Sequence, residues 1–264
     1  MSDIRKFRRG FRPGHEPEIK AAPMTVIPKV WEPPSQGEDG RIHVLLAVTS
    51  IDGFIRWSIA QQMCRAIMAN ADPACPFHFE TLIVNGMRPV EFARNYCRDY
   101  FLDKTKCQIL QFWDSDQEIP DNWPALFQVD SHVVSGNTFC WVGNEQVGSR
   151  LRYNQYSIDE KGECFNIHPM SDVQPFPVPI VGTACMSIRR EVFEALGPDP
   201  FEMTRYPSGR IRASEDVNFC IKARNQGFNV AVHPGVTFGH VKSIDLLHVA
   251  QFSTERCEMY KNEM

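Results

Sequence analysis

The sequence lacks the features that would place it in a membrane or in an oxidising compartment. No apolar run in its 264 residues approaches the roughly 20 residues that a membrane-spanning helix needs. The basic amino terminus has no apolar core of the kind that a secretory signal requires. The nine cysteines include no Cys-x-x-Cys pair and are odd in number, which argues against a disulfide framework or a zinc site. We therefore expect a cytoplasmic protein, with Cys140, Cys185 and Cys220 as small core residues.

The composition indicates a folded domain that follows a different kind of segment. Hydrophobic residues make up 43% of the chain, which is enough for a sizeable core, and the formal net charge is only −4. Residues 1–40 contain six prolines and show no helical or strand period. The first 20 residues carry six basic and three acidic side chains. We expect an extended arm there, either an ordinary poorly ordered terminus or a basic tether for an acidic partner.

Apolar runs and helical spacing alternate in the first part of the domain. Strands that alternate with helices form a parallel sheet through right-handed crossovers, so a βαβαβ unit is predicted. Its strands are expected over 41–48, 78–85 and 107–113, and its helices over 55–70 and 90–102.

The order of elements changes in the second part. Residues 148–178 have little regular period and many aromatic and polar side chains, so we expect a functional loop or a small insertion. Strands are predicted over 138–142, 181–188 and 228–232, and helices over 120–129, 190–196, from Ser214 to Gly227, and from 244 onward.

Two carboxylates, Asp114 and Asp116, follow the strand predicted over 107–113. Open α/β sheets bind their ligands at the carboxyl ends of the strands. Paired carboxylates at such a place suit a divalent cation that carries phosphates. Asp-Ser-Asp is also an ordinary turn after a strand, so its interpretation depends on the residues downstream.

A second acidic pair, Glu215 and Asp216, opens a predicted helix. Ser214 is a natural N-cap, which puts both acids in the first helical turn. The helix dipole favours the ionised carboxylate there and keeps it available as a ligand or a base. Acids at a helix start also occur without any catalytic role.

Taken in order, these features resemble a GT-A fold nucleotide-sugar glycosyltransferase of the family-2-like kind. The resemblance covers residues 41–243 and rests on the opening strand, Asp-x-Asp, a Gly-Thr-Ala strand that runs into Arg-Arg-Glu-Val-Phe, Glu-Asp, and a late Gly-His. It implies an α/β/α sandwich with a mixed, mostly parallel sheet, a nucleotide-binding half at 41–116 and an acceptor half at 117–243. Residues 1–40 would be the arm and 244–264 a helical tail.

The resemblance also implies roles for individual residues. Asp114 and Asp116 would bind a divalent metal that holds the donor diphosphate, and His240 would complete its shell. Two carboxylates and an imidazole suit Mn²⁺ somewhat better than Mg²⁺. Asp216 would be the general base, with Glu215 as the alternative. Donor binding is assigned to Thr49, Ser50, Asp52, Arg94, Asp114, Ser115, Asp116, Gly182 and Thr183, with Ala184 beside them.

The implied activity is metal-dependent transfer of a sugar from a nucleotide sugar, expected to be a UDP-sugar, to an acceptor hydroxyl. The first strand lacks the usual Pro-Thr start, which puts the nucleoside contacts in question, and no Gln-x-x-Arg-Trp follows Glu-Asp, which argues against a processive synthase. One alternative is a nucleotidyltransferase, although Thr49–Arg56 holds one glycine where such enzymes carry a glycine-rich loop. Another is a binding module that kept the fold.

The motifs do not identify the acceptor. In one variant the basic arm binds a DNA acceptor with a hydroxymethylated base, and bacteriophage enzymes that act on such DNA exist. A saccharide, a protein or a small molecule fits equally well, and Glu-Asp occurs in both inverting and retaining enzymes. The DNA variant would also use Arg189, Arg190, Arg210 and Arg212.

Overall fold

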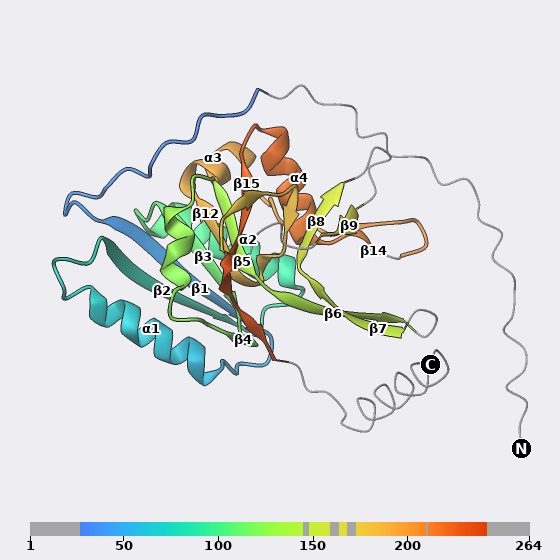
Figure 1. Cartoon of the computed structure of the whole chain (residues 1–264), viewed down its shortest axis with the longest axis horizontal. Coiled ribbons are helices and arrows are strands. Elements are labelled where there is room, and N and C mark those ends of the chain that lie inside the picture. The colour runs from blue at the N-terminus through green and yellow to red at the C-terminus, as the bar shows by residue number, and fades with distance from the viewer. Residues whose placement is uncertain (1–26, 145–147, 159–163, 168–172, 210, 242–264) are drawn as a thin grey trace, which may run out of the picture.

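The computed structural model describes residues 27–144, 148–158, 164–167, 173–209 and 211–241. A seven-stranded sheet in the order β10-β15-β5-β12-β3-β1-β2 runs through the molecule (Figure 1). β12 lies antiparallel to both of its neighbours, and β10 lies antiparallel to β15, while all other pairs are parallel. Five of the seven strands, all but β10 and β12, therefore run in the same direction, which confirms the expected mixed, mostly parallel sheet. Its strands are β1 (Ile42–Ser50), β2 (Phe77–Asn85), β3 (Ile109–Asp114), β5 (Val133–Asn137), β10 (Phe176–Pro177), β12 (Met186–Arg189) and β15 (Val230–Thr237).

The predicted βαβαβ unit forms the half of the sheet that contains β1, β2 and β3. α1 (Trp57–Ala69) connects β1 to β2, and α2 (Val90–Lys104) connects β2 to β3. Ile59 and Met63 of α1 are buried on one face of the sheet, in a cluster with Val44 and Leu46. α2 covers the other face. Because β1 is buried on both faces, it is apolar along most of its length, as strands of parallel sheets usually are.

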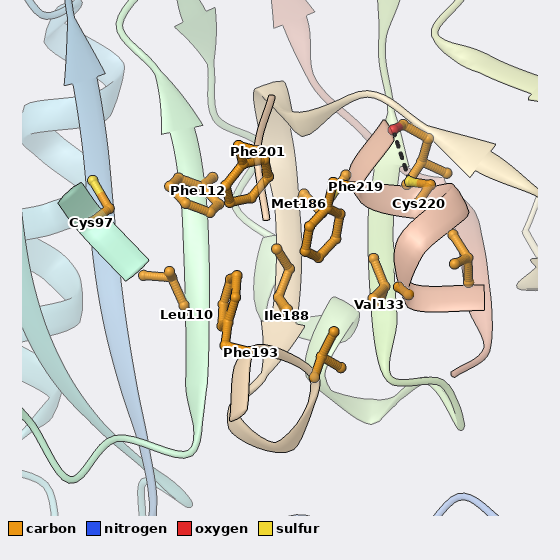
Figure 2. Packing of buried hydrophobic residues seen from close by; sticks show 14 of the residues in the cluster. Cys97, Leu110, Phe112, Val133, Met186, Ile188, Phe193, Phe201, Phe219 and Cys220 are labelled. Carbon is orange, nitrogen blue, oxygen red and sulfur yellow. Dashed lines mark hydrogen bonds between the residues drawn. The ribbon is translucent and has the colours of Figure 1, made fainter. Parts of the chain in front are cut away.

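Helices cover both faces of the sheet, so the expected α/β/α sandwich is confirmed. On one face, α2, α3 (Arg190–Leu196) and α4 (Glu215–Asn225) pack in a cluster of buried side chains (Figure 2). The rings of Phe201 and Phe219 stack there with centroids 4.6 Å apart. α1 and the short 3-10 helix η1 (Trp123–Gln128) cover the other face.

Two of the three cysteines that were predicted to be core residues can be compared with the structure. Cys185 and Cys220 are buried with free thiols, as predicted, and Cys220 donates from Sγ to the Val181 carbonyl at 3.5 Å (Figure 2). The side chain of Cys140 lies outside the described residues. Across the described ranges, every helix is too short or too polar to span a bilayer.

A strand is present where one was predicted over 138–142, but it lies outside the main sheet. The strand that joins the sheet is β5, which the sequence analysis missed because Ser135, Gly136 and Asn137 interrupt its apolar pattern. The next segment, β6 (Phe139–Asn144), leaves the sheet and pairs with β7 (Gly148–Tyr153) in a hairpin.

The segment over 148–178, expected to be a functional loop or a small insertion, contains short strands in its described parts. After β7, the short strand β8 (Gln155–Ile158) pairs with β9 (Cys164–Asn166) on one side and β11 (Ile180–Val181) on the other. β10 then joins the edge of the main sheet. These strands are two to six residues long, too short to show a period that the sequence would reveal.

Several boundaries differ from the prediction. The helix expected over 120–129 is the 3-10 helix η1, and the strand expected over 181–188 is interrupted by η2 (Thr183–Cys185), which leaves β12 as the sheet strand. The strand expected over 228–232 continues as β15. Four further strands form two-stranded ribbons: β4 (Gln117–Glu118) with β16 (Gly239–His240), and β13 (Thr204–Arg205) with β14 (Ile211–Ala213).

The described part of the arm, residues 27–40, contains no helix or strand. It is held against the domain by Lys29, whose backbone N–H donates to the Gly227 carbonyl at 2.9 Å. The Lys29 ammonium lies 3.7 Å from the centre of the Phe228 ring. Residues 1–26 and the expected helix from 244 onward lie outside the described residues.

Candidate functional site

Asp116 and His240 meet beyond the carboxyl end of β3. Asp116 directly precedes β4, and His240 pairs with Gln117 across the β4–β16 ribbon. Nε2 of His240 lies 3.2 Å from Oδ2 of Asp116, and Nδ1 lies 2.8 Å from the Phe139 carbonyl. Because a carbonyl oxygen only accepts, Nδ1 carries the proton, and Nε2 of a neutral ring presents its lone pair to the carboxylate. Two acceptors that face each other are stabilised by a proton or a cation between them.

This donor set fits a divalent cation. A carboxylate oxygen with an imidazole nitrogen suits Mn²⁺, and the Phe139 carbonyl holds the ring in the tautomer that a metal ligand needs. The third expected ligand, Asp114, instead accepts hydrogen bonds from Arg94 and Thr49. Within the described ranges, no three His, Cys, Asp or Glu side chains are grouped so as to hold a metal ion. Asp116 and His240 are therefore the pair that could hold one.

A hydrogen-bond network around Arg94 connects α2, β3, α4 and β1 next to the Asp-Ser-Asp turn. Arg94 lies on α2, is 4% exposed, and donates from Nη2 to Asp114 Oδ1 at 3.1 Å. Its Nη1 donates to Glu215 Oε1 at the start of α4. Thr49 at the end of β1 donates from Oγ1 to the same Asp114 oxygen at 3.2 Å. The structure thus brings Thr49, Arg94, Asp114 and Glu215 together, with one guanidinium between two carboxylates.

Ser50 and Asp52 shape the loop between β1 and α1. Ser50 Oγ donates to the Phe54 carbonyl at 2.9 Å, and Asp52 Oδ1 accepts the Phe54 N–H at 3.1 Å. This last bond holds the pKa of Asp52 below its ordinary value. The loop reaches Ser115, whose carbonyl accepts the Arg56 N–H at 3.2 Å. These two side chains organise the loop next to the Asp-Ser-Asp turn.

Gly182 and Thr183 lie in a tightly packed segment that joins β11 to β12. A Cβ on Gly182 would come within 1.7 Å of Asn154 Nδ2, so only glycine fits without a shift of Asn154. The Gly182 N–H donates to the Asn154 carbonyl at 3.0 Å. Thr183 and Ala184 are 1% and 7% exposed. The expected donor-lining segment is thus buried, and its assignment to the donor stays a prediction.

Glu215 and Asp216 take different directions at the start of α4. Ser214 is the N-cap residue, as predicted, but its hydroxyl donates to Asp216 Oδ1 and does not cap the helix. Asp216 Oδ1 also accepts the Val217 N–H at 2.8 Å, while Oδ2 takes no hydrogen bond from the residues that the structure describes. Glu215 is buried against Arg94. Sequence reasoning missed this Arg94–Glu215 contact, because spacing does not indicate which helices touch.

The basic residues assigned to a DNA acceptor are partly contradicted. Arg189 is 4% exposed. Arg190 donates from Nη2 to the carbonyls of Phe101 at 2.8 Å and Thr105 at 3.0 Å, at the end of α2. Both side chains serve the packing of the domain, so they offer no surface to nucleic acid. Arg212 is exposed, and Arg210 lies outside the described residues.

No protein-family model matches the sequence, and no curated protein matches it. Among solved structures, A197 from STIV is 17% identical with a TM-score of 0.49, over 76% of this chain and 87% of that one. GalNAc-T7, solved with UDP, GalNAc and Mn²⁺, is 15% identical with a TM-score of 0.49, over 79% of this chain and 45% of that one. The inositol-1-phosphate CTP transferase from T. maritima is 10% identical with a TM-score of 0.36, over 79% and 91%.

Identities this low with TM-scores below 0.5 assign no activity. The fold follows from the sheet itself, with its βαβαβ half and the reversed strand β12 between β3 and β5. The described residues thus form a mixed α/β fold around a seven-stranded sheet, and its assignment to the GT-A transferases stays a prediction.

Proposed function

We propose that the chain is a metal-dependent glycosyltransferase that moves a sugar from a nucleotide sugar, a UDP-sugar, to an acceptor hydroxyl. The observation that carries this proposal is the approach of His240 Nε2 to Asp116 Oδ2 at 3.2 Å, beyond the carboxyl end of β3. The donor class comes from the resemblance of the ordered motifs. The orientation of the imidazole supports the metal, because its other nitrogen is held by a backbone carbonyl.

Asp116 and His240 would hold the cation. When bound, a divalent cation neutralises the diphosphate leaving group as a Lewis acid. The Asp114 carboxylate, between Thr49 and Arg94, supports a second polar contact to the donor at the ends of β1 and β3. The loop built by Ser50 and Asp52 would contact the nucleoside.

Asp216 is the proposed general base. As the acceptor oxygen bonds to the anomeric carbon, the bond from that carbon to the diphosphate breaks, and the hydroxyl proton passes to Asp216. It lies in the first turn of α4, and its Oδ2 takes no hydrogen bond within the described part of the chain. Glu215 is less suited to this role because Arg94 holds it.

Product analysis tests the class of reaction. The protein is incubated with UDP-sugars, Mn²⁺ and a panel of acceptors that includes saccharides and duplex DNA with hydroxymethylated bases. Metal-dependent release of UDP with glycosylated acceptor is expected, and Asp116→Asn should abolish it. A nucleotidyltransferase, given a sugar phosphate and a nucleoside triphosphate, would release pyrophosphate instead. A protein that binds nucleotide and forms neither product would be a binding module.

The acceptor is tested in the same assay. A DNA acceptor predicts that transfer falls steeply as salt rises, since counterion release dominates phosphate contacts. Deletion of residues 2–20 should then weaken transfer to DNA and leave hydrolysis of the donor unchanged. Transfer that is insensitive to salt and to this deletion would favour an uncharged acceptor such as a saccharide.

A further inference from the structure

Arg94 and Glu215 are both buried, and they pair with each other. Their exposed fractions are 4% and 5%, and the contact joins the second turn of α2 to the first turn of α4. On its other side Arg94 donates from Nη2 to both oxygens of Asp114, at 3.1 and 3.4 Å. The Asp114 side chain is 29% exposed, so it is the only member of this row of three that solvent reaches easily.

The geometry leaves Arg94 and Glu215 little room for a direct contact with a substrate. Both terminal nitrogens of the guanidinium already donate to a carboxylate, and Nε is buried without a partner among the described residues. A donor phosphate would have to displace Asp114 or Glu215 from Arg94. An acceptor would have to draw Glu215 out of its pair and leave a buried charge behind, which is costly.

We propose that Glu215 and Arg94 are positioning residues that act on Asp114. Glu215 binds the guanidinium on one side. The guanidinium and Thr49 together hold the Asp114 carboxylate in one orientation at the ends of β1 and β3. Arg94 therefore contacts no donor phosphate, and Glu215 contacts no acceptor. The consequence for donor binding rests on the proposed function, whereas the coupling of the three side chains does not.

The coupling is tested without any ligand. Unfolding free energies are measured for Glu215→Gln, Asp114→Asn and the double variant, first with Arg94 present and then in an Arg94→Met background. We expect non-additive effects with Arg94 present and additive effects without it, because Arg94 transmits the interaction. The exposed Glu191 of α3 provides the control: Glu191→Gln combined with Asp114→Asn should be additive. Additive effects for Glu215 and Asp114 with Arg94 present would overturn the proposal.

The positioning role is tested by the binding of UDP with Mn²⁺, measured by calorimetry. Glu215→Gln should weaken this binding about 10- to 100-fold, the range typical of residues that orient a ligand-binding group. Arg94→Lys should not restore the affinity lost in Arg94→Met, because one ammonium cannot bond two carboxylates as the guanidinium fork does.

The remaining outcomes distinguish failure of the positioning role from failure of the proposed function. Unchanged affinity in Glu215→Gln, or full affinity in Arg94→Lys, would overturn the positioning role while the proposed function stands. If the wild-type protein bound neither UDP nor any other nucleoside diphosphate, the proposed function would fail and the positioning role with it. A coupled cycle would then identify the row as purely structural.

Discussion

His240 Nε2 lies 3.2 Å from Asp116 Oδ2, although the two residues are 124 positions apart in the chain. Backbone bonds on both sides hold this approach in place. The Val241 N–H donates to the Asp116 carbonyl at 2.9 Å, and the Phe238 N–H donates to the Asn137 carbonyl at 2.8 Å. The end of β15 and the ribbon strand β16 thus carry His240 past β5 to the Asp-Ser-Asp turn.

Removing either member of this pair should abolish metal-dependent nucleotide binding. Asp116→Asn and His240→Gln each remove a ligand for the cation, while the side chains are 32% and 19% exposed and carry little of the core. We expect each to change the unfolding free energy by about 1 kcal/mol or less. Calorimetric titration with UDP, with and without Mn²⁺, measures the loss.

The exposed Asp130, at the opposite end of β5 from Asn137, provides a matched control for that experiment. Asp130→Asn removes the same charge from the chain and should leave the affinity for UDP and Mn²⁺ unchanged. If Asp116→Asn bound the metal and the nucleotide as tightly as Asp130→Asn does, Asp116 would not be a ligand.

Asp216→Asn should lower turnover and leave donor binding intact. A positioned general base typically accounts for about 10²- to 10⁴-fold in rate. The loss of a negative charge from the first turn of α4 should cost only about 0.3–1 kcal/mol of stability. Steady-state kinetics with saturating donor measures the effect. Normal turnover in Asp216→Asn would require another base.

Gly136→Ala should destabilise the domain and disturb the site. A Cβ at Gly136 would come within 2.4 Å of the Phe238 ring and 2.7 Å of the Val236 carbonyl, both in a fully buried region. Overpacking of this kind costs about 1–3 kcal/mol. Because Phe238 lies two residues before His240, we also expect weaker metal-dependent binding.

Denaturant unfolding measures the destabilisation, and Gly235→Ala on β15 is the control. There the atoms nearest to the added Cβ would be His233 Cε1 at 3.2 Å and the Val173 backbone at 3.4 Å. A Gly136→Ala protein as stable as Gly235→Ala would show that Phe238 moves aside without cost.

Protonation of His132 should lower the free energy of unfolding in mild acid. Burial lowers the pKa of His132 below the ordinary 6.5, with the charges of Arg189 and Lys29 acting in the same direction, and Nδ1 accepts the Asn229 N–H at 3.2 Å. The unfolded chain therefore binds the proton more readily than the native one. Stability is fully present above pH 6.5 and is lost as the pH falls from 6.5 toward the lower native pKa.

Melting temperatures of the wild type and His132→Gln between pH 8 and pH 5 measure this effect. Burial also lowers the pKa of His78 and of His233, so His132→Gln should remove part of the acid sensitivity and not all of it. An unchanged slope of melting temperature against pH in His132→Gln would contradict the assignment.

The first half of the fold could be predicted from the sequence, and the second half only in part. Val44 to Val48 form a continuous apolar run because parallel strands are buried on both faces. β5 escaped prediction because its polar and glycine positions serve contacts made by distant residues. Gly136 accommodates the Phe238 ring, and Ser135 Oγ donates to the Gly182 carbonyl at 3.3 Å.

The candidate site, too, could be predicted from the sequence only in part. Motif order singled out Asp114, Asp116 and His240 together, yet only Asp116 and His240 approach each other, because Arg94 and Thr49 hold Asp114. The role of Arg94 as a bridge depends on the packing of α2 against α4. No local pattern in the sequence carries that information.

One measurement tests the central claim most directly. The melting temperature is recorded with a panel of nucleoside diphosphates and nucleotide sugars, first with Mn²⁺ and then with EDTA, because a ligand that binds only the native state raises it by mass action. The account predicts a rise with UDP and UDP-sugars that requires Mn²⁺ and disappears in Asp116→Asn and His240→Gln. The absence of a rise with every nucleotide, with or without metal, would contradict it.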